Sequence, residues 1–210
     1  MQQKFKLFTV ALIVSGFATI SLQSACSSDA ATSENQPVSA APEKKELSKS
    51  EMIARGQYLS VGCNDCHSPK VFTEHGFHFD STKLFSGHPQ GSPLPSVDKK
   101  ALQPGYWLLF SGDITAFVGP WGMSFSANLT PDSTTGIGAW SEETFIKTMR
   151  SGKHLGQDGG RPIMPPMPWE VVAKLTDEDI KSIYAYLQSL PAVKNQVPAY
   201  MPPPEVAKMK

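Results

Sequence analysis

The stretch VGCNDCHSPK, residues 61–70, places two thiols and one imidazole within five consecutive positions. Cys63, Cys66 and His67 form a C-x-x-C-H pattern, and the chain has one further cysteine, Cys26. Thiolates and neutral imidazoles are metal ligands, and a pair of thiols can also form a disulfide or bond covalently to a cofactor. The spacing therefore suggests four chemistries: a structural zinc site, a thiol redox pair, a plain disulfide, or covalent attachment of a haem.

The requirements of these four chemistries differ. A structural zinc site needs four ligands, commonly from two clusters, and the sequence has no second cysteine pair. A thioredoxin-like pair opens a helix that follows a strand, whereas Cys63 follows a helical pattern. A disulfide leaves His67 without a role. Covalent haem uses all three residues, because the thiols form thioethers to the porphyrin and the histidine binds iron. We therefore predict one haem c held by Cys63, Cys66 and His67.

The iron of an electron carrier needs a sixth ligand, and both histidines and methionines are candidates. The segment RPIMPPMPWE holds Met164 and Met167 among four prolines, which restrict φ and favour extended backbone. A thioether raises the reduction potential of haem iron, so this stiff loop is the predicted source of the ligand. Methionine elsewhere is expected to fill the core, at Met52, Met123 and Met149. The other histidines are expected in loops or at the surface, with His154 as the alternative ligand: His75, His78, His88 and His154.

Three helical patterns must position these residues. The first, SEMIARGQYLS from about Ser50 to Ser60, leads into Cys63. The second opens at Ser141 as N-cap and stops at Gly152. The third, TDEDIKSIYAYLQSLP, opens with a Thr176 to Asp179 pair close to a capping box and ends before Pro191, with an apolar face of Ile180, Ile183, Tyr184, Leu187 and Leu190.

The long region between Ser68 and Trp140 must contain structure of its own, because structureless loops of this length are uncommon. The segment YWLLFSGDITAFV has two apolar, β-prone runs around residues 111–113, which predicts a hairpin, and MSFSANL suggests a third short strand. The tryptophans of this region are expected to be packing residues: Trp107, Trp121 and Trp140.

The first residues have the pattern of an export signal. Two lysines precede an apolar run from Leu7 to Ile20, which is shorter than a membrane-spanning helix requires. In SLQSACSS the Ala25-Cys26 pair resembles a lipobox, and cleavage after Ala30 is the alternative. We predict a lipoprotein-like signal peptide over residues 1–26 and a periplasmic protein anchored to a membrane through Cys26.

Composition divides the rest of the chain. Residues 27–47 are small, polar and charged, which predicts a disordered tether. Residues 191–210 are rich in proline and are expected to form an irregular tail along the surface, leaving 48–190 as the folded domain. The 19 Lys and Arg balance the 19 Asp and Glu, so no nucleic-acid partner is expected.

The motifs together resemble class I c-type cytochromes. A helix leading into CNDCH, a proline-flanked methionine about a hundred positions later and an aromatic C-terminal helix carry this resemblance. NLTPDSTTGIGAWSEETFIKTMRSGKH followed by PPMPW is similar to the haem modules in cytochrome subunits of bacterial alcohol and gluconate dehydrogenases. In those modules an MPY or MPW methionine is the distal ligand, so the resemblance implies Met167 rather than Met164.

The resemblance also implies a fold that is mainly α, a cytochrome c-like haem domain. Its first and last helices cross at right angles, with Gly56 near Tyr184. Relative to this fold, residues 68–127 are a long loop insertion that can carry a short β-hairpin. The related subunits usually carry three haem motifs and this chain carries one, so one haem is expected. Arg161 and Trp140 are candidate hydrogen-bond donors to the haem propionates.

The expected function is that of a monohaem electron carrier rather than an enzyme. It would pass single electrons between redox proteins of the periplasm or membrane, such as a membrane-bound dehydrogenase or a terminal oxidase. Two alternatives stay open. One is a haem enzyme or ligand sensor with an open sixth position. The other is a subunit permanently docked to a dehydrogenase through the insertion.

Overall fold

The structure is a computed structural model and describes residues 46–209. The predicted signal peptide with Cys26 and most of the predicted tether lie outside the described residues. Between residues 46 and 209, every helix is too short or too polar to cross a membrane.

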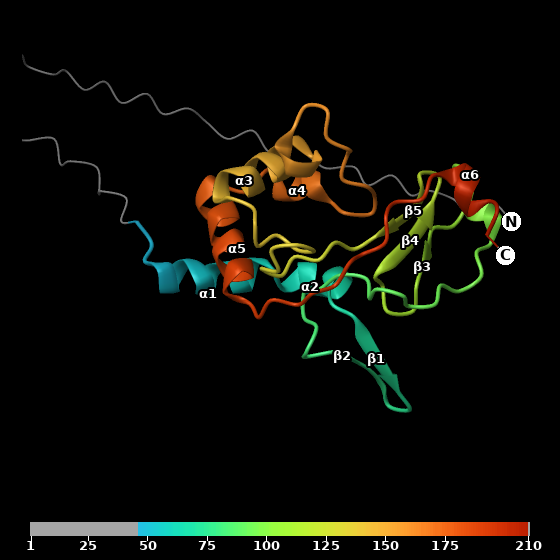
Figure 1. Cartoon of the computed structure of the whole chain (residues 1–210), viewed down its shortest axis with the longest axis horizontal. Helices are drawn as coiled ribbons and strands as arrows, with labels where there is room; N and C mark the ends of the chain where they lie inside the picture. The colour runs from blue at the N-terminus through green and yellow to red at the C-terminus, as the bar shows by residue number, and fades with distance from the viewer. Residues whose placement is uncertain (1–45, 210) are drawn as a thin grey trace, which may run out of the picture. The chain divides into compact units, whose positions relative to one another are not determined.

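The described residues form six α-helices and two small antiparallel sheets (Figure 1). The helices are α1 Lys49–Leu59, α2 Val61–His67, α3 Glu142–Ser151, α4 Trp169–Val172, α5 Asp177–Ser189 and α6 Pro203–Val206. Two 3-10 turns are also present: η1 Lys99–Leu102, within the insertion, and η2 His154–Gly156, between α3 and α4. The prediction of a mainly α fold with a β-hairpin in the insertion is confirmed.

The ends of the long helices follow local capping chemistry. The Ser141 hydroxyl accepts the backbone N–H of Thr144, and α3 ends at Gly152, which has a left-handed φ of 65°. The Thr176 hydroxyl accepts the N–H of Asp179 at the start of α5. Each of these ends agrees with the sequence prediction, because a cap depends on neighbouring residues alone.

Helix α1 crosses α5 at a point where only a glycine fits (Figure 1). A Cβ on Gly56 would lie 1.9 Å from the carbonyl oxygen of Ser182 and 2.8 Å from the Cβ of Tyr186. The prediction that Gly56 lies near Tyr184 is wrong, because the nearest atoms belong to Ser182 and Tyr186. The Tyr184 ring instead packs on Phe145, with ring centroids 5.5 Å apart. The Arg55 guanidinium adds a 2.6 Å hydrogen bond to Asp179 across the crossing.

The main hydrophobic core lies between α3, α5 and the segments that follow the thiol motif. Burial of its apolar side chains is the chief stabilising contribution, at about 25 cal/mol per Å². The buried members are Phe85, Ile137, Phe145, Met149, Ile180, Ile183 and Leu187. Phe85 belongs to the insertion, so the insertion takes part in the core.

The insertion carries two antiparallel sheets. Strands β3 Leu109–Phe110, β4 Ala116–Gly119 and β5 Gly122–Phe125 form one, which confirms the predicted hairpin and the predicted third strand. Strands β1 Lys70–Thr73 and β2 Gly76–Phe79 form the other, directly after α2. This second hairpin was not predicted; it has mostly exposed residues and so lacks the alternation of a half-buried strand.

The C-terminal segment differs from the predicted irregular surface tail. Met201 pairs with Met123 of β5 through backbone hydrogen bonds of 2.9 and 3.0 Å. Helix α6 then buries Val206 completely in a second hydrophobic cluster, beside Ala101, Val118 and Met123. Proline-rich composition predicts irregular backbone but carries no signal of burial, which is why Val206 was missed.

Candidate functional site

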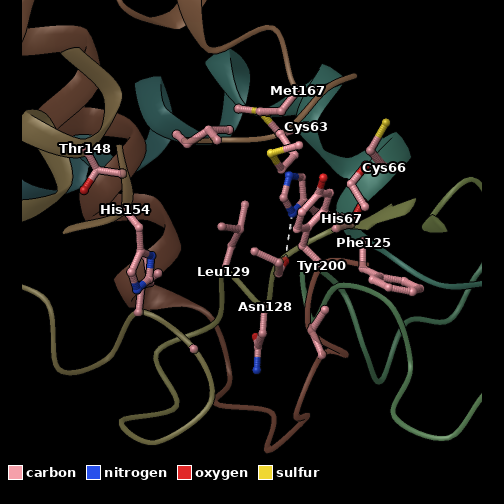
Figure 2. Close-up of a pocket in the computed structure, with 18 of the residues that line it drawn as sticks. Cys63, Cys66, His67, Phe125, Asn128, Leu129, Thr148, His154, Met167 and Tyr200 are labelled. Carbon is pink, nitrogen blue, oxygen red and sulfur yellow. Dashed lines mark hydrogen bonds between the residues drawn. The ribbon is translucent and has the colours of Figure 1, made fainter. Parts of the chain in front are cut away.

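One cavity of about 1010 Å³ contains the predicted site residues (Figure 2). Cys63, Cys66 and His67 of α2 line it, and so do Met164 and Met167 of the proline-rich loop. Its volume is at the upper end of the roughly 300–1,000 Å³ typical of ligand sites. The cavity is therefore large enough for a bulky cofactor.

Helix α2 gives the three motif residues their arrangement. Positions 63, 66 and 67 are three and four residues apart, so they lie on neighbouring parts of one helix face. Figure 2 shows both thiols and the imidazole projecting from this short helix. The sequence predicts the motif, but not that it is helical.

The His67 ring is fixed in one orientation and one tautomer. It is buried, and its Nδ1 lies 2.8 Å from the carbonyl oxygen of Ala127, the bond dashed in Figure 2. A carbonyl can only accept, so Nδ1 carries the proton and Nε2 is the basic nitrogen. Burial lowers the pKa of His67, and the weaker effect of the Ala127 carbonyl raises it. The ring is therefore held as a neutral imidazole, the form that binds metals.

The two thiols are free and are not activated as nucleophiles. Burial raises the pKa of Cys63, and the neighbouring Cys66 raises it further. Burial also raises the pKa of Cys66, although Lys70 opposes this. A catalytic redox pair needs a lowered thiol pKa. The environment of these thiols therefore disfavours the redox-pair alternative.

The methionine loop, residues 164–168, forms another part of the cavity wall. Met164 and Met167 are half-buried, and the N–H of Met167 donates to the Met164 carbonyl at 3.3 Å. The Pro165 carbonyl accepts a 2.5 Å hydrogen bond from the Ser124 hydroxyl of β5. Both thioethers are thus brought to the cavity that His67 lines (Figure 2 labels Met167).

The four remaining histidines fall into three environments. His154 lines the cavity, with its ring edge-on to Trp140 at a centroid distance of 5.6 Å. His75 and His78 are exposed, around the turn of the β1–β2 hairpin. His88 was expected in a loop or at the surface; it does lie in a loop, but it is buried, and its Nδ1 lies 2.8 Å from the Thr115 hydroxyl.

The predicted roles of the tryptophans and of Arg161 can be compared with their positions. Trp140 packs against the main core and also lines the cavity. Arg161 is exposed and lines the same cavity. Both residues therefore lie at the cavity, and their role as donors to haem propionates stays a prediction. Trp107 was expected to pack and is wrong, because 77% of its surface is exposed.

Residues of the insertion and the C-terminal segment complete the cavity wall, and sequence reasoning did not find them. Ser124, Phe125 and Ala127 come from the end of the insertion, and Tyr200 from the C-terminal segment. The signal that could have indicated them is the proximity of a third predicted strand to the family-like segment that starts at Asn128. Within the described range, no group of three or more His, Cys, Asp and Glu side chains could hold a metal ion.

Comparisons with known proteins agree with this geometry. Residues 53–191 match the family Cytochrome c. The fructose dehydrogenase cytochrome subunit of Gluconobacter japonicus is 32% identical over 129 residues, 50% of this chain and 26% of that protein. The gluconate 2-dehydrogenase cytochrome c subunit of Pantoea cypripedii is 31% identical over 137 residues, 64% of this chain and 22% of that protein. The cytochrome c subunit of the quinone-dependent alcohol dehydrogenase of Gluconobacter oxydans is 40% identical over 67 residues, 32% of this chain and 13% of that protein. The chain therefore spans about a quarter or less of the length of these relatives.

Proposed function

The chain belongs to the cytochrome c family, and we propose that it is a monohaem electron carrier of the periplasm. Members of this family bind covalently attached haem c and transfer electrons. The observation that carries the proposal is that His67, fixed by Ala127, shares one cavity with both motif thiols and two proline-flanked thioethers.

The residues of the cavity fit the cofactor. Cys63 and Cys66 would attach the porphyrin, and their half-buried, protonated thiols are available to form thioether bonds. His67 would bind iron through Nε2, because Nδ1 already donates to Ala127. Met167 is the proposed sixth ligand, supported by its cavity position and by the MPW motif. The bound iron supplies one-electron chemistry, since it can exist in a ferric and a ferrous state.

The protein itself sets the conditions for electron transfer. Buried apolar side chains around the cavity, such as Phe145 and Ile137, exclude water and favour the less charged, reduced state. If His67 and Met167 both bind the iron, no position would be left for a substrate. The chain is therefore proposed to be a carrier and not an enzyme.

The proposed donor is a dehydrogenase. Relatives are named as cytochrome subunits of fructose and gluconate dehydrogenases, which supports a partner of that class.

For the whole chain we propose a signal peptide (1–26) with a lipid anchor on Cys26, a tether (27–47), a haem domain (48–190) and a proline-rich C-terminal segment (191–210). A tether would let the haem domain reach its partners near one membrane.

Permanent docking to the dehydrogenase is a second candidate, favoured by the surface of the insertion. Phe72, Phe77, Trp107 and Phe110 each expose more than half of their surface, and exposed aromatic residues are enriched at protein interfaces. Co-purification of a dehydrogenase with the chain from native membranes would support docking. Recovery of the chain as a lone monomer would support a shuttle.

Replacement of the proposed sixth ligand tests the function. Met167→Ala should keep the covalent haem but lower its reduction potential by on the order of 0.1 V, because axial ligands set potentials over roughly 0.8 V. Protein-film voltammetry gives the potential, and Met52→Ala, on α1 and outside the cavity lining, is the matched control. An unchanged potential and spectrum in Met167→Ala would indicate that Met164 or His154 is the sixth ligand instead.

A further inference from the structure

Three hydrogen bonds in series join the C-terminal segment, the insertion and the methionine loop. The Tyr200 hydroxyl donates to the Trp121 carbonyl at 2.5 Å. The Trp121 indole Nε1–H donates to the Ser124 hydroxyl at 3.2 Å, and that hydroxyl donates to the Pro165 carbonyl at 2.5 Å. Tyr200, Ser124 and Pro165 also line the cavity.

The chemistry of these groups fixes the direction of every bond. Carbonyl oxygens only accept and an indole N–H only donates. The Ser124 hydroxyl therefore accepts from Trp121 and gives its single proton to Pro165. Ser124 is buried, with 6% of its surface exposed, so water cannot readily replace either partner.

The methionine loop is poor in backbone donors, and the nearest backbone anchor lies just before it, where the Ile163 N–H donates to the Gly152 carbonyl at 2.7 Å. Pro165, Pro166 and Pro168 have no N–H, and the N–H groups of Met167 and Trp169 bond within the loop. Among the described residues, Ser124 makes the one hydrogen bond that ties residues 164–168 to a distant part of the chain. Prolines stiffen the loop, but they do not fix its position against the cavity.

Two glycines allow Trp121 and the C-terminal segment to take these positions. A Cβ on Gly119 would lie 2.3 Å from Cζ3 of the Trp121 ring, so the indole can fold over the end of β4 only because residue 119 is glycine. Gly122 has a φ of 105°, and a Cβ there would lie 2.2 Å from the Met201 carbonyl oxygen. The turn between β4 and β5 is thus shaped to hold the indole and to admit the C-terminal segment.

We propose that Ser124, Trp121 and Tyr200 are positioning residues for the iron-binding methionine. They hold the Pro165 carbonyl, and with it the methionine loop, against the cavity. The proposal rests on the proposed function, because it requires a methionine of this loop to be the sixth ligand. It assigns the insertion and the C-terminal segment a role in setting the strength of that ligation.

Competition by a small ligand measures this role directly. Imidazole added to the ferric holoprotein competes with methionine for the sixth position, so a loosened loop gives tighter imidazole binding. Ser124→Ala should tighten imidazole binding by roughly two- to tenfold, the ratio that corresponds to one ordinary hydrogen bond. Tyr200→Phe should act in the same direction with a smaller factor, because its bond is two steps from the loop.

Matched variants separate positioning from general damage. Ser189→Ala removes a hydroxyl that donates to the Tyr186 carbonyl, and Tyr106→Phe removes one that donates to Asp98, both away from the cavity. These two controls should bind imidazole as the unmodified protein does. Haem content and far-ultraviolet circular dichroism identify a variant that fails to fold, and Tyr200→Phe provides a second, conservative test.

The series arrangement gives a further test. Trp121→Phe keeps a ring over Gly119 but removes the N–H. If Trp121 acts through Ser124, the double variant Trp121→Phe/Ser124→Ala should bind imidazole no more tightly than Ser124→Ala alone. Fully additive effects would contradict a relay.

The outcomes distinguish the two proposals. Imidazole affinities of Ser124→Ala and Tyr200→Phe equal to those of the controls, with much tighter binding in Met167→Ala, would overturn the positioning role and leave the proposed ligand standing. Equal affinities in the unmodified protein, Met167→Ala and Met164→Ala would contradict methionine ligation, and the positioning role would fall with it.

Discussion

The cavity is lined by two regions of the molecule, which differ in how well they could be predicted from the sequence. The helical half of the described chain, α1, α2, α3 and α5, lines the cavity with residues of α1, α2 and α3, and it carries the C-x-x-C-H motif and helix ends set by local caps. The strand-and-tail half, residues 109–127 and 191–209, supplies the Ala127 carbonyl, the Ser124 hydroxyl and Tyr200. In the proposed haem site the first half would supply the two thiols and the imidazole, and the second half holds His67 and the methionine loop through hydrogen bonds. Orientation depends on contacts between distant residues, so it leaves little local signal.

The largest effect is expected at the crossing that defines the helical half. Gly56→Ala places a Cβ 1.9 Å from the Ser182 carbonyl oxygen, where backbone must move. The gain in helix propensity, about 1 kcal/mol, does not offset this overpacking, and we expect a net loss of about 2 kcal/mol or more. Chemical denaturation of the holoprotein measures the free energy of unfolding.

Gly159→Ala is the control for this prediction, because a Cβ there meets no atom within 4 Å. It should change stability by less than about 0.5 kcal/mol. A Gly56→Ala protein as stable as the control would mean that α1 and α5 do not approach as described.

A smaller effect tests whether the strand-and-tail half is an integral part of the fold. Val206 is fully buried in the second cluster, and Val206→Ala removes about two methylene equivalents, or about 1.5–2 kcal/mol. Val171→Ala, at a position with 63% exposure, is the matched control and should be nearly neutral. Equal melting temperatures for the two variants would contradict the burial of Val206 and would agree with an irregular surface tail.

The smallest effect concerns the turn that links the halves at residues 130–136. Hydrogen bonds from Thr135 and then from Thr134 lower the pKa of Asp132 to about 2. Because the folded pKa lies below the ordinary value of 3.8, the contribution of this carboxylate to stability is complete above pH 4. It is lost as the pH falls toward 2.

Carboxyl chemical shifts of Asp132 followed by NMR give this pKa. In Thr135→Val the midpoint should move up toward the ordinary range, since the largest of the lowering contributions is removed. A midpoint near 3.8 in the unmodified protein would show that the turn does not hold the carboxylate as described.

Local patterns account for what the sequence could predict. Ser141, Gly152 and Thr176 delimit helices through bonds to near neighbours. The spacing of Cys63 and His67 specifies a chemistry whatever the surrounding fold. The same local reasoning singled out Met164 and Met167 of the proline-rich loop, and both residues line the cavity.

The unpredicted features share a different cause. A backbone carbonyl such as that of Ala127 can accept a hydrogen bond at any residue type, so its role cannot be read from the sequence. The burial of His88 and Val206 depends on segments far away in the chain. Even Gly56, correctly placed at the helix crossing, meets Ser182 and Tyr186 rather than Tyr184, because the face of α5 is set by packing.

The most direct test of the central claim is the intact mass and visible spectrum of the mature chain, after export in cells that mature c-type cytochromes. We predict a mass that exceeds that of the polypeptide by one haem. The haem should not be extracted by acidified organic solvent. We also predict a reduced spectrum of six-coordinate, low-spin iron that does not change promptly with carbon monoxide. A colourless protein with the mass of the polypeptide alone would contradict the account.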